Sequence, residues 1–379
     1  MNLKSLLLCS DEKIVRVLRR TLGDLDIGVE HCTGAEDALR RLTRERFEAI
    51  IVDCAGPGAA DVLRAARNAP CNKRAIAVAI LDPDTGLRSA FEIGAHFILY
   101  KPVTAERAKS SFRAARALMK KERRRNTRVA VRFPVEMSSV DSDNRLKVHT
   151  TDVGEGGLAV SLPRRSKLRG RWQLMFTLPG SQTRLEVAAE FAWEGTGIQA
   201  GLRFQDASPE FERQMREWLG RNSPEGEKDD PPVRCQLTDL SLGGCYLDIP
   251  SPFPVSTRVT LSMRASDVEL RSEGVVRIMH PDKGMGVEFT QTTPEHRGLL
   301  EKFLGRLAEN PNVLPELLVE PEGLDTEPGQ HSRTAAGSCE TGDPLLDLFR
   351  SHLALGADSF LLELRKQRGG TVAAAGASA

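Results

Sequence analysis

The sequence contains a repeat, which limits the folds available to the chain more than any other feature. The segment Thr151–Gly157 (TDVGEGG) returns as Thr238–Gly244 (TDLSLGG). A second landmark, Gly201–Phe204 (GLRF), returns as Gly286–Phe289 (GVEF), in the same order and at nearly the same spacing. Two landmarks that recur together predict two copies of one small domain.

Length and composition exclude several classes of protein. The chain has 379 residues, enough for two to three domains, and 40% of them are hydrophobic, which is ordinary for a soluble protein. A net charge of +1 and the lack of a helix-turn-helix pattern disfavour DNA as a partner. No apolar run is long enough to span a membrane. Seven cysteines, scattered without a metal-binding spacing, indicate a reducing cytoplasm, with neither zinc nor disulfides.

Residues 1–122 alternate short apolar runs with helical patterns, which predicts a parallel sheet flanked by helices. The candidate strands are residues 5–8, 28–32, 49–53, 75–81 and 97–100. Five such units predict a flavodoxin-like α/β domain whose functional site lies at the carboxyl ends of the strands.

The rest of the chain has a different character. Residues 123–222 and 231–308 carry alternating strand patterns broken by turn residues, and each ends in an amphipathic helix that follows a proline. They predict two small antiparallel β-barrels, each with a C-terminal helix. Residues 309–343 are rich in Pro, Glu, Gly, Ser and Thr and predict a disordered linker. Residues 344–379 predict an amphipathic helix, for packing, self-association or partner docking, and a disordered tail.

The N-terminal domain resembles the receiver domain of two-component response regulators. The resemblance rests on Asp53 at the end of the third strand, Pro57-Gly58, Gly94-Ala95 and Lys101-Pro102. It implies that Asp53 is the phosphoacceptor and that Lys101 pairs with the phosphoryl oxygens. The family holds Mg²⁺ on an acidic pair after the first strand, where this chain has Cys9-Ser10.

Mg²⁺ needs oxygen ligands, so a thiol and a hydroxyl in place of two carboxylates predict that no metal binds. We therefore expect a pseudo-receiver that serves as an interaction or dimerisation module, which makes a homodimer a candidate assembly. Asp53 and Lys101 would then form a partly buried ion pair. The alternative is that residual phosphorylation of Asp53 still switches the protein.

The two repeats resemble PilZ domains, bacterial sensors of the second messenger cyclic di-GMP. The family motif is Arg-x-x-x-Arg on an N-terminal loop, followed by Asp/Asn-x-Ser-x-x-Gly after the next strand. In the first copy the motif residues are Arg124, Arg128, Asp152, Gly154 (in place of the serine) and Gly157. The chemistry suits the ligand, because guanidinium groups bind phosphate oxygens in pairs and match the O6 and N7 acceptors of guanine. A glycine-rich turn lets backbone N–H groups approach ligand oxygens closely.

The second copy keeps the serine of the motif but lacks the arginine pair. Asp239, Ser241 and Gly244 are intact, but no Arg-x-x-x-Arg precedes them. The chain between Arg221 and Asp239 is also too short for both the arginine loop and a full first strand. We expect this copy to be a structural partner or a protein-docking surface. A composite site, with arginines from one copy and the turn of the other, is the alternative.

The resemblances together predict a cytoplasmic signalling protein. It would bind cyclic di-GMP through the first PilZ-like domain and relay the signal by interdomain rearrangement to an unidentified protein partner. The alternative is an adaptor that binds no nucleotide and acts in motility, pilus or surface regulation. The sequence contains no Ser/His/Asp set, P-loop or zinc motif, so we expect no enzymatic activity, and no cofactor apart from the ligand.

Overall fold

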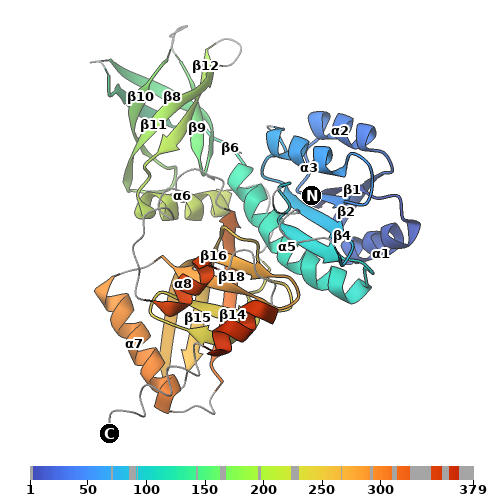
Figure 1. Ribbon diagram of the computed structural model, residues 1–379. Helices are drawn as coiled ribbons and strands as arrows, with labels where there is room; N and C mark the ends of the chain where they lie inside the picture. Colours follow the sequence, from blue (N-terminus) through green and yellow to red (C-terminus); the bar gives the residue numbers. More distant parts are fainter. Residues whose placement is uncertain are drawn as a thin grey trace. The chain divides into compact units, whose positions relative to one another are not determined.

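The computed structural model (Figure 1) describes most of the chain. The described residues are 3–69, 71–84, 91, 93–141, 144–162, 168–194, 198–222, 230–265, 267–290, 293–309, 314–324, 343–351 and 358–366. They fall into two compact units, Met1–Glu122 with Asp229–Ala379, and Arg123–Lys228. Among the described residues, no helix combines the length and the apolar character that crossing a membrane requires.

Five parallel strands form the N-terminal sheet. They are β1 (Leu3–Leu8), β2 (Ile27–Cys32), β3 (Ala49–Asp53), β4 (Ile76–Leu81) and β5 (Phe97–Tyr100). Their spatial order is β2-β1-β3-β4-β5, which is the predicted flavodoxin-like order. Every residue of β3 and β4 is buried, because helices cover both faces of a parallel sheet.

Four helices flank this sheet in the described part of the domain. They are α1 (Glu12–Gly23), α2 (Ala35–Arg44), α3 (Ala59–Asn68) and α5 (Ala105–Asn126). Leu18 of α1 and Phe112 of α5 pack with Leu7 on one face of the sheet. Helices α2 and α3 contribute to the core of the other face, which contains Leu6. The connection at residues 85–90 lies outside the described residues.

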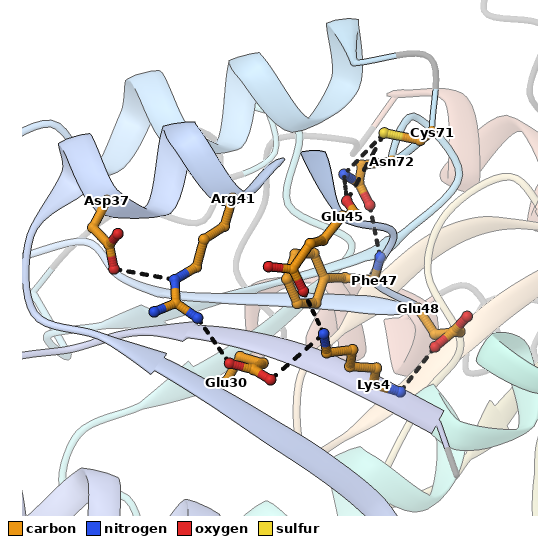
Figure 2. Close-up of polar contacts among 9 residues, drawn as sticks. All are labelled: Lys4, Glu30, Asp37, Arg41, Glu45, Phe47, Glu48, Cys71 and Asn72. Atoms are coloured by element: carbon orange, nitrogen blue, oxygen red, sulfur yellow. Dashed lines mark hydrogen bonds and ion pairs between the residues drawn. The ribbon is translucent and has the colours of Figure 1, made fainter. Parts of the chain in front are cut away.

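Polar groups tie the α2–β3 connection to the α3–β4 connection and to β1 (Figure 2). The buried side chain of Asn72 accepts a hydrogen bond from the Phe47 backbone N–H at 2.8 Å and donates to the Glu45 carbonyl oxygen at 2.8 Å. It also donates to the Leu42 carbonyl oxygen at 2.7 Å. Nearby, Lys4 Nζ lies 2.5 Å from Glu45 Oε2, but both of these side chains are more than a third exposed. The hydrogen bonds of the Asn72 amide are therefore buried, whereas the ion pair of Lys4 with Glu45 is exposed to solvent.

Replacing Asn72 by alanine is expected to destabilise the N-terminal domain by about 2–4 kcal/mol, because buried backbone groups lose their partners. Lys4→Ala is the matched control, and it is expected to cost less than about 1 kcal/mol since exposed ion pairs contribute little. Urea denaturation of both variants measures the difference. Equal losses of stability in the two variants would contradict this interpretation of the network.

The unit Arg123–Lys228 contains the first barrel. Its elements are β6 (Val129–Ala130), β7 (Pro134–Ser139), β8 (Arg145–Gly154), β9 (Gly157–Ser161), β10 (Arg171–Thr177), β11 (Arg184–Glu194), β12 (Gln199–Gln205) and α6 (Pro209–Asn222). The order is β6-β8-β7-β10-β11-β12-β9, and the β8–β9 pairing closes the ring. Phe211, Met215 and Trp218 of α6 are buried in the barrel core, so the helix belongs to the domain.

The second barrel has the same plan. Its elements are β13 (Val233–Leu240), β14 (Gly244–Asp248), β15 (Thr257–Ala265), β16 (Val268–His280), β17 (Gly284–Phe289), α7 (Pro294–Glu309) and β18 (Glu316–Leu324). The strands close in the order β13-β14-β17-β16-β15-β18. The prediction of two antiparallel barrels, each followed by a helix, is confirmed.

Strand β18 corrects the predicted domain boundary. The prediction that residues 309–343 form a disordered linker is wrong for Glu316–Leu324, and the second barrel extends beyond residue 308. This strand pairs with β13 and β15, as β7 pairs with β8 and β10 in the first barrel. The second copy lacks chain for a strand before β13, so the strand that completes the ring comes from after α7. Residues 310–313 and 325–342 lie outside the described residues.

The N-terminal domain packs against the second barrel within their common unit. Along α5, Ser110 Oγ lies 2.6 Å from Ser251 Oγ, and Lys120 Nζ lies 2.8 Å from Asp230 Oδ1. Glu122 accepts a hydrogen bond from the Leu324 backbone N–H at 2.8 Å. The side chains of Lys120 and Glu122 are nearly fully buried. These contacts make one face of α5 part of a domain interface.

Candidate functional site

The turn between β8 and β9 forms the floor of the candidate site. Gly154 pairs with Gly157 across this turn, and Gly157 pairs with Arg203 of β12. A Cβ atom on Gly157 would lie only 2.2 Å from the Leu202 carbonyl oxygen, so this close approach of β9 to β12 requires glycine. The glycines leave the outer surface of the barrel without side chains at this point.

Strand alternation decides which side chains border this floor. Val153, Leu158 and Leu202 face the core and are buried. The residues between them, which include Asp152 and Arg203, therefore face outward. The outer face of the first barrel thus presents a glycine floor between a carboxylate and an arginine.

Arg128 and Asp152 are joined directly. Arg128 Nε donates a hydrogen bond to Asp152 Oδ1, and Thr151 Oγ1 donates to Asp152 Oδ2 at 3.1 Å. The side chains are 41% and 29% exposed, respectively. Exposed ion pairs contribute at most about 1 kcal/mol, so this pair positions the guanidinium group beside the turn and can be rearranged at little cost.

The predicted serine position is filled by Gly154. A Cβ atom there would lie 3.2 Å from the Thr127 carbonyl oxygen and 3.4 Å from Arg128 Cγ. The arginine loop therefore lies directly over the turn. Arg124 is in the last turn of α5, which ends where the Thr127 N–H donates to the Arg124 carbonyl oxygen at 2.9 Å.

Three further residues lie on this face that the sequence did not assign to the site. Glu155 lies in the turn, where its carboxylate is 4.0 Å from Arg125 Nε and 3.3 Å from Arg216 Nε. Arg203 borders Gly157, and Trp193, 43% exposed, covers Gly201. The sequence offered one indication of a role for Arg203, because its counterpart in the second repeat is Glu288, which carries the opposite charge.

The family described as PilZ domain matches residues 122–221 and 222–306. Both repeats are PilZ domains. The second match ends before β18, which is the strand that this domain takes from later in the chain. PilZ domains are in general regulatory and non-catalytic. No curated protein sequence matches the chain.

Several solved structures are similar to parts of the chain. The PilZ domain of CeSA from a cellulose-synthesizing bacterium has 22% identity and a TM-score of 0.20, and the match covers 25% of this chain and 93% of that chain. The receiver domain of the sensor histidine kinase PA1611 from Pseudomonas aeruginosa has 22% identity and a TM-score of 0.29, covering 32% and 99%. The chemotaxis response regulator CheY4 of Vibrio cholerae has 22% identity and a TM-score of 0.29, covering 30% and 99%.

The turn of the second PilZ domain has a different electrostatic character. Ser241 organises it, because its hydroxyl accepts from the N–H groups of Gly243 and Gly244 at 3.3 and 3.2 Å. Glu288 pairs with Gly244 in the position that Arg203 has in the first domain. The Glu288 carboxylate lies 2.5 Å from Arg277 Nε. An acidic side chain at this place opposes an anionic ligand.

The receiver-like domain brings Asp53 and Lys101 together, as predicted. Lys101 Nζ lies 2.9 Å from Asp53 Oδ1 and 3.7 Å from Asp82 Oδ1. Burial opposes the positive charge, but the hydrogen bond and charge of Asp53 raise the pKa of Lys101 above its usual value. Asp53 itself is almost fully buried at the carboxyl end of β3. The pair is therefore a partly buried ion pair.

The donor atoms around Asp53 do not suit Mg²⁺. Cys9 Sγ lies 3.6 Å from Asp53 Oδ2, and burial raises the pKa of this thiol to about 11, which keeps it protonated at neutral pH. Asp11 caps α1, where Oδ1 accepts from the Lys13 N–H at 2.8 Å. Within the described ranges, no three His, Cys, Asp or Glu side chains are grouped so that they could hold a metal ion.

The buried thiols give a testable pH dependence. Burial raises the pKa of Cys9 from 9.0 to about 11 and that of Cys235 to about 12. The native state therefore holds these protons more tightly than the unfolded chain does. The free energy of unfolding should be independent of these groups below pH 9 and should fall as the pH rises from 9 toward 11. Urea denaturation across this range measures the fall, and Cys9→Ala should reduce it; an equal fall in that variant would contradict the assignment.

Proposed function

We propose that the first PilZ domain binds cyclic di-GMP on its outer face and that the chain is a cytoplasmic, non-enzymatic effector of this nucleotide. The observation that carries the proposal is the placement of Arg128 beside Asp152, over a glycine floor. Guanidinium groups bind phosphate oxygens and guanine acceptors, and Asp152 is an acceptor for guanine N–H donors. Arg203 adds positive charge at the opposite edge of the floor.

Trp193 gives the proposed site a stacking surface. Its indole is 43% exposed, whereas the side chains of Trp172 and Trp218 are buried. A base that stacks on an indole gains about 1–3 kcal/mol. Trp193 lies on β11, which β12 separates from β9. It pairs with Gly201 of β12, and Gly201 in turn pairs with Ala159 of β9. We infer that a guanine of the ligand extends from the arginines toward this ring.

The experiment that tests the proposal follows tryptophan emission of the full chain during titration with cyclic di-GMP. A saturable change with a midpoint in the micromolar range or tighter is expected, and it should vanish in Trp193→Phe, which retains the fold. Cyclic GMP, with a single guanine and a single phosphate, is the matched control and should bind far more weakly. A folded chain that shows neither an emission change nor heat of binding would leave the non-nucleotide adaptor as the function.

A charge reversal at Arg203 tests the electrostatic part of the site. Arg203→Glu copies the residue of the second domain, and it is expected to lower the affinity for cyclic di-GMP by about tenfold or more. Arg203→Gln removes the charge without reversing it and should have a smaller effect. Dye-labelled ligand binding measures both variants at the same ionic strength. Equal affinity in wild type and Arg203→Glu would show that this edge does not contact the ligand.

We infer that the signal leaves the first domain through the Thr127–Arg128 loop, which continues directly from α5. The earlier turns of α5 contact the second barrel through Lys120 and Glu122. Ordering of the loop by ligand would restrict the connection between the two units and so alter the surface offered to a protein partner. Slower amide exchange at residues 123–128 on ligand addition is the expected result, and unchanged or faster exchange would contradict it.

A further inference from the structure

The C-terminal segment covers the outer face of the second PilZ domain. Asp343 immediately precedes helix α8 (Pro344–Ser351), and its Oδ1 accepts from the Leu345 N–H at 3.0 Å. The other oxygen of the same carboxylate, Oδ2, accepts from the Gly243 N–H at 2.8 Å. Asp343 therefore caps the helix and at the same time binds the backbone of the glycine turn. An acidic group of the chain itself satisfies an N–H group of this turn.

Apolar side chains continue the contact across the barrel. A Cβ atom on Gly243 would lie 2.5 Å from Leu346 Cδ1, and one on Gly286 would lie 2.6 Å from the Phe349 ring. The ring of Phe360, in the helical residues 358–366, lies 5.1 Å from that of Tyr246. The buried residues of this cluster are Tyr246, Ile278, Leu345, Leu346, Leu348, Phe349, Phe360 and Leu364.

The floor of the second domain differs from that of the first in ways that suit a helix. Tyr246 stands where the first domain has Ala159, since each pairs with the corresponding glycine of the repeated Gly-x-x-Phe strand. The Tyr246 hydroxyl is satisfied by His280 Nδ1 at 2.9 Å, so the ring can be covered without leaving a buried hydroxyl unpaired. This floor is therefore bulkier than the floor beside Asp152, where the small Ala159 holds the same place.

The charges at the edge of this face also suit a helix. Glu288, the counterpart of Arg203, faces Arg350 of α8, with Arg350 Nη2 3.8 Å from Glu288 Oε1. On the same face, Trp193 pairs with and covers Gly201 in the first domain, whereas in the second domain Gly286 is covered both by its strand partner Ile278 and by Phe349 of the segment. The C-terminal segment thus adds an aromatic ring and a cation to a face on which Ile278 and Glu288 replace Trp193 and Arg203 of the first domain.

We propose that the second PilZ domain is a helix-binding module and that the two helical stretches at residues 343–351 and 358–364 are its resident ligand. The glycine turn binds the acidic N-cap, and the apolar floor binds the leucine and phenylalanine side chains that follow. The segment excludes nucleotide from this domain by occupying its turn.

Amide hydrogen exchange of the full chain tests the proposal. The double variant Leu346→Glu/Phe349→Glu introduces charges into the apolar contact, whereas Leu362→Glu changes a leucine of the same segment that is 56% exposed. Exchange at residues 243–246 and 345–350 is expected to accelerate roughly 100-fold in the double variant and to stay at the wild-type rate in the control. Persistent protection of β15 and β16 would show that the barrel remains folded.

A peptide of residues 343–366 completes the experiment. Added to the double variant, it is expected to restore protection of residues 243–246, and the same peptide with Leu346→Glu should not. The proposal is overturned if the double variant keeps wild-type protection at the turn, or if the peptide leaves the exposed turn unprotected while β15 and β16 stay protected.

Discussion

A chain that carries Arg128→Ala is expected to bind cyclic di-GMP about 10- to 100-fold more weakly than the wild type. The substitution removes charge-assisted hydrogen bonds to the ligand, each of which contributes about 1.5–3 kcal/mol. It also removes the partner of Asp152, but that pair is exposed, so the stability of the fold should change little. Calorimetric titration measures the affinity, and thermal denaturation checks the fold.

Arg184→Ala is the matched control for this prediction. Arg184 is also an exposed arginine of the first barrel, and its Nη2 lies 2.6 Å from Glu136 Oε2, on β7. Its loss removes the same charge and an ion pair of the same class, on strands that do not carry the glycine floor. Equal losses of affinity in Arg128→Ala and Arg184→Ala would show that only the net charge of the domain matters.

Gly157→Ala is expected to destabilise the first barrel by more than about 3 kcal/mol and to abolish ligand binding. The added Cβ would lie 2.2 Å from the Leu202 carbonyl oxygen, so β9 and β12 must separate and lose part of the pairing that closes the barrel. Denaturation of the variant by urea measures the loss.

Gly156→Ala is the control for the glycine prediction. It is one residue away, and a Cβ atom there would meet nothing within 4 Å. It is expected to change stability by less than about 0.5 kcal/mol and to leave the affinity for cyclic di-GMP close to that of the wild type. Comparable damage from the two substitutions would mean that general loss of turn flexibility, and not the contact with β12, explains the glycine requirement.

The sequence predicted the architecture well where local patterns carry it. Short apolar runs that alternate with helical patterns predicted the five parallel strands, and the repeated Thr-Asp turn predicted the two barrels. The prediction was wrong for Glu316–Leu324, because a stretch rich in Glu, Pro and Gly was taken for a linker. Its alternating Leu317 and Val319 carry the strand signal, but the barrel needs this strand only because β13 has no predecessor. Closure of a ring is a property of the whole fold, which no local pattern encodes.

The candidate site was predicted in part. Arg128 and Asp152 carry the motif, and the structure brings them into contact. Arg203 and Trp193 are far from the motif in sequence and reach the same face only through the strand order of the barrel. The packing of the C-terminal segment on the second domain could not be predicted either, because the sequence of an amphipathic helix does not show which surface the helix packs against. The pairing of Asp343 with Gly243 needs both segments in place.

The central claim is that the first domain binds cyclic di-GMP and the second does not. Calorimetric titration of the full chain in three forms tests it most directly: wild type, Arg124→Ala/Arg128→Ala, and Asp239→Ala. The account predicts micromolar or tighter binding in the wild type, at least 100-fold weaker binding in the double variant, and unchanged binding in Asp239→Ala. Binding that survives in the double variant and is lost in Asp239→Ala, or no heat from a folded wild type, would contradict it.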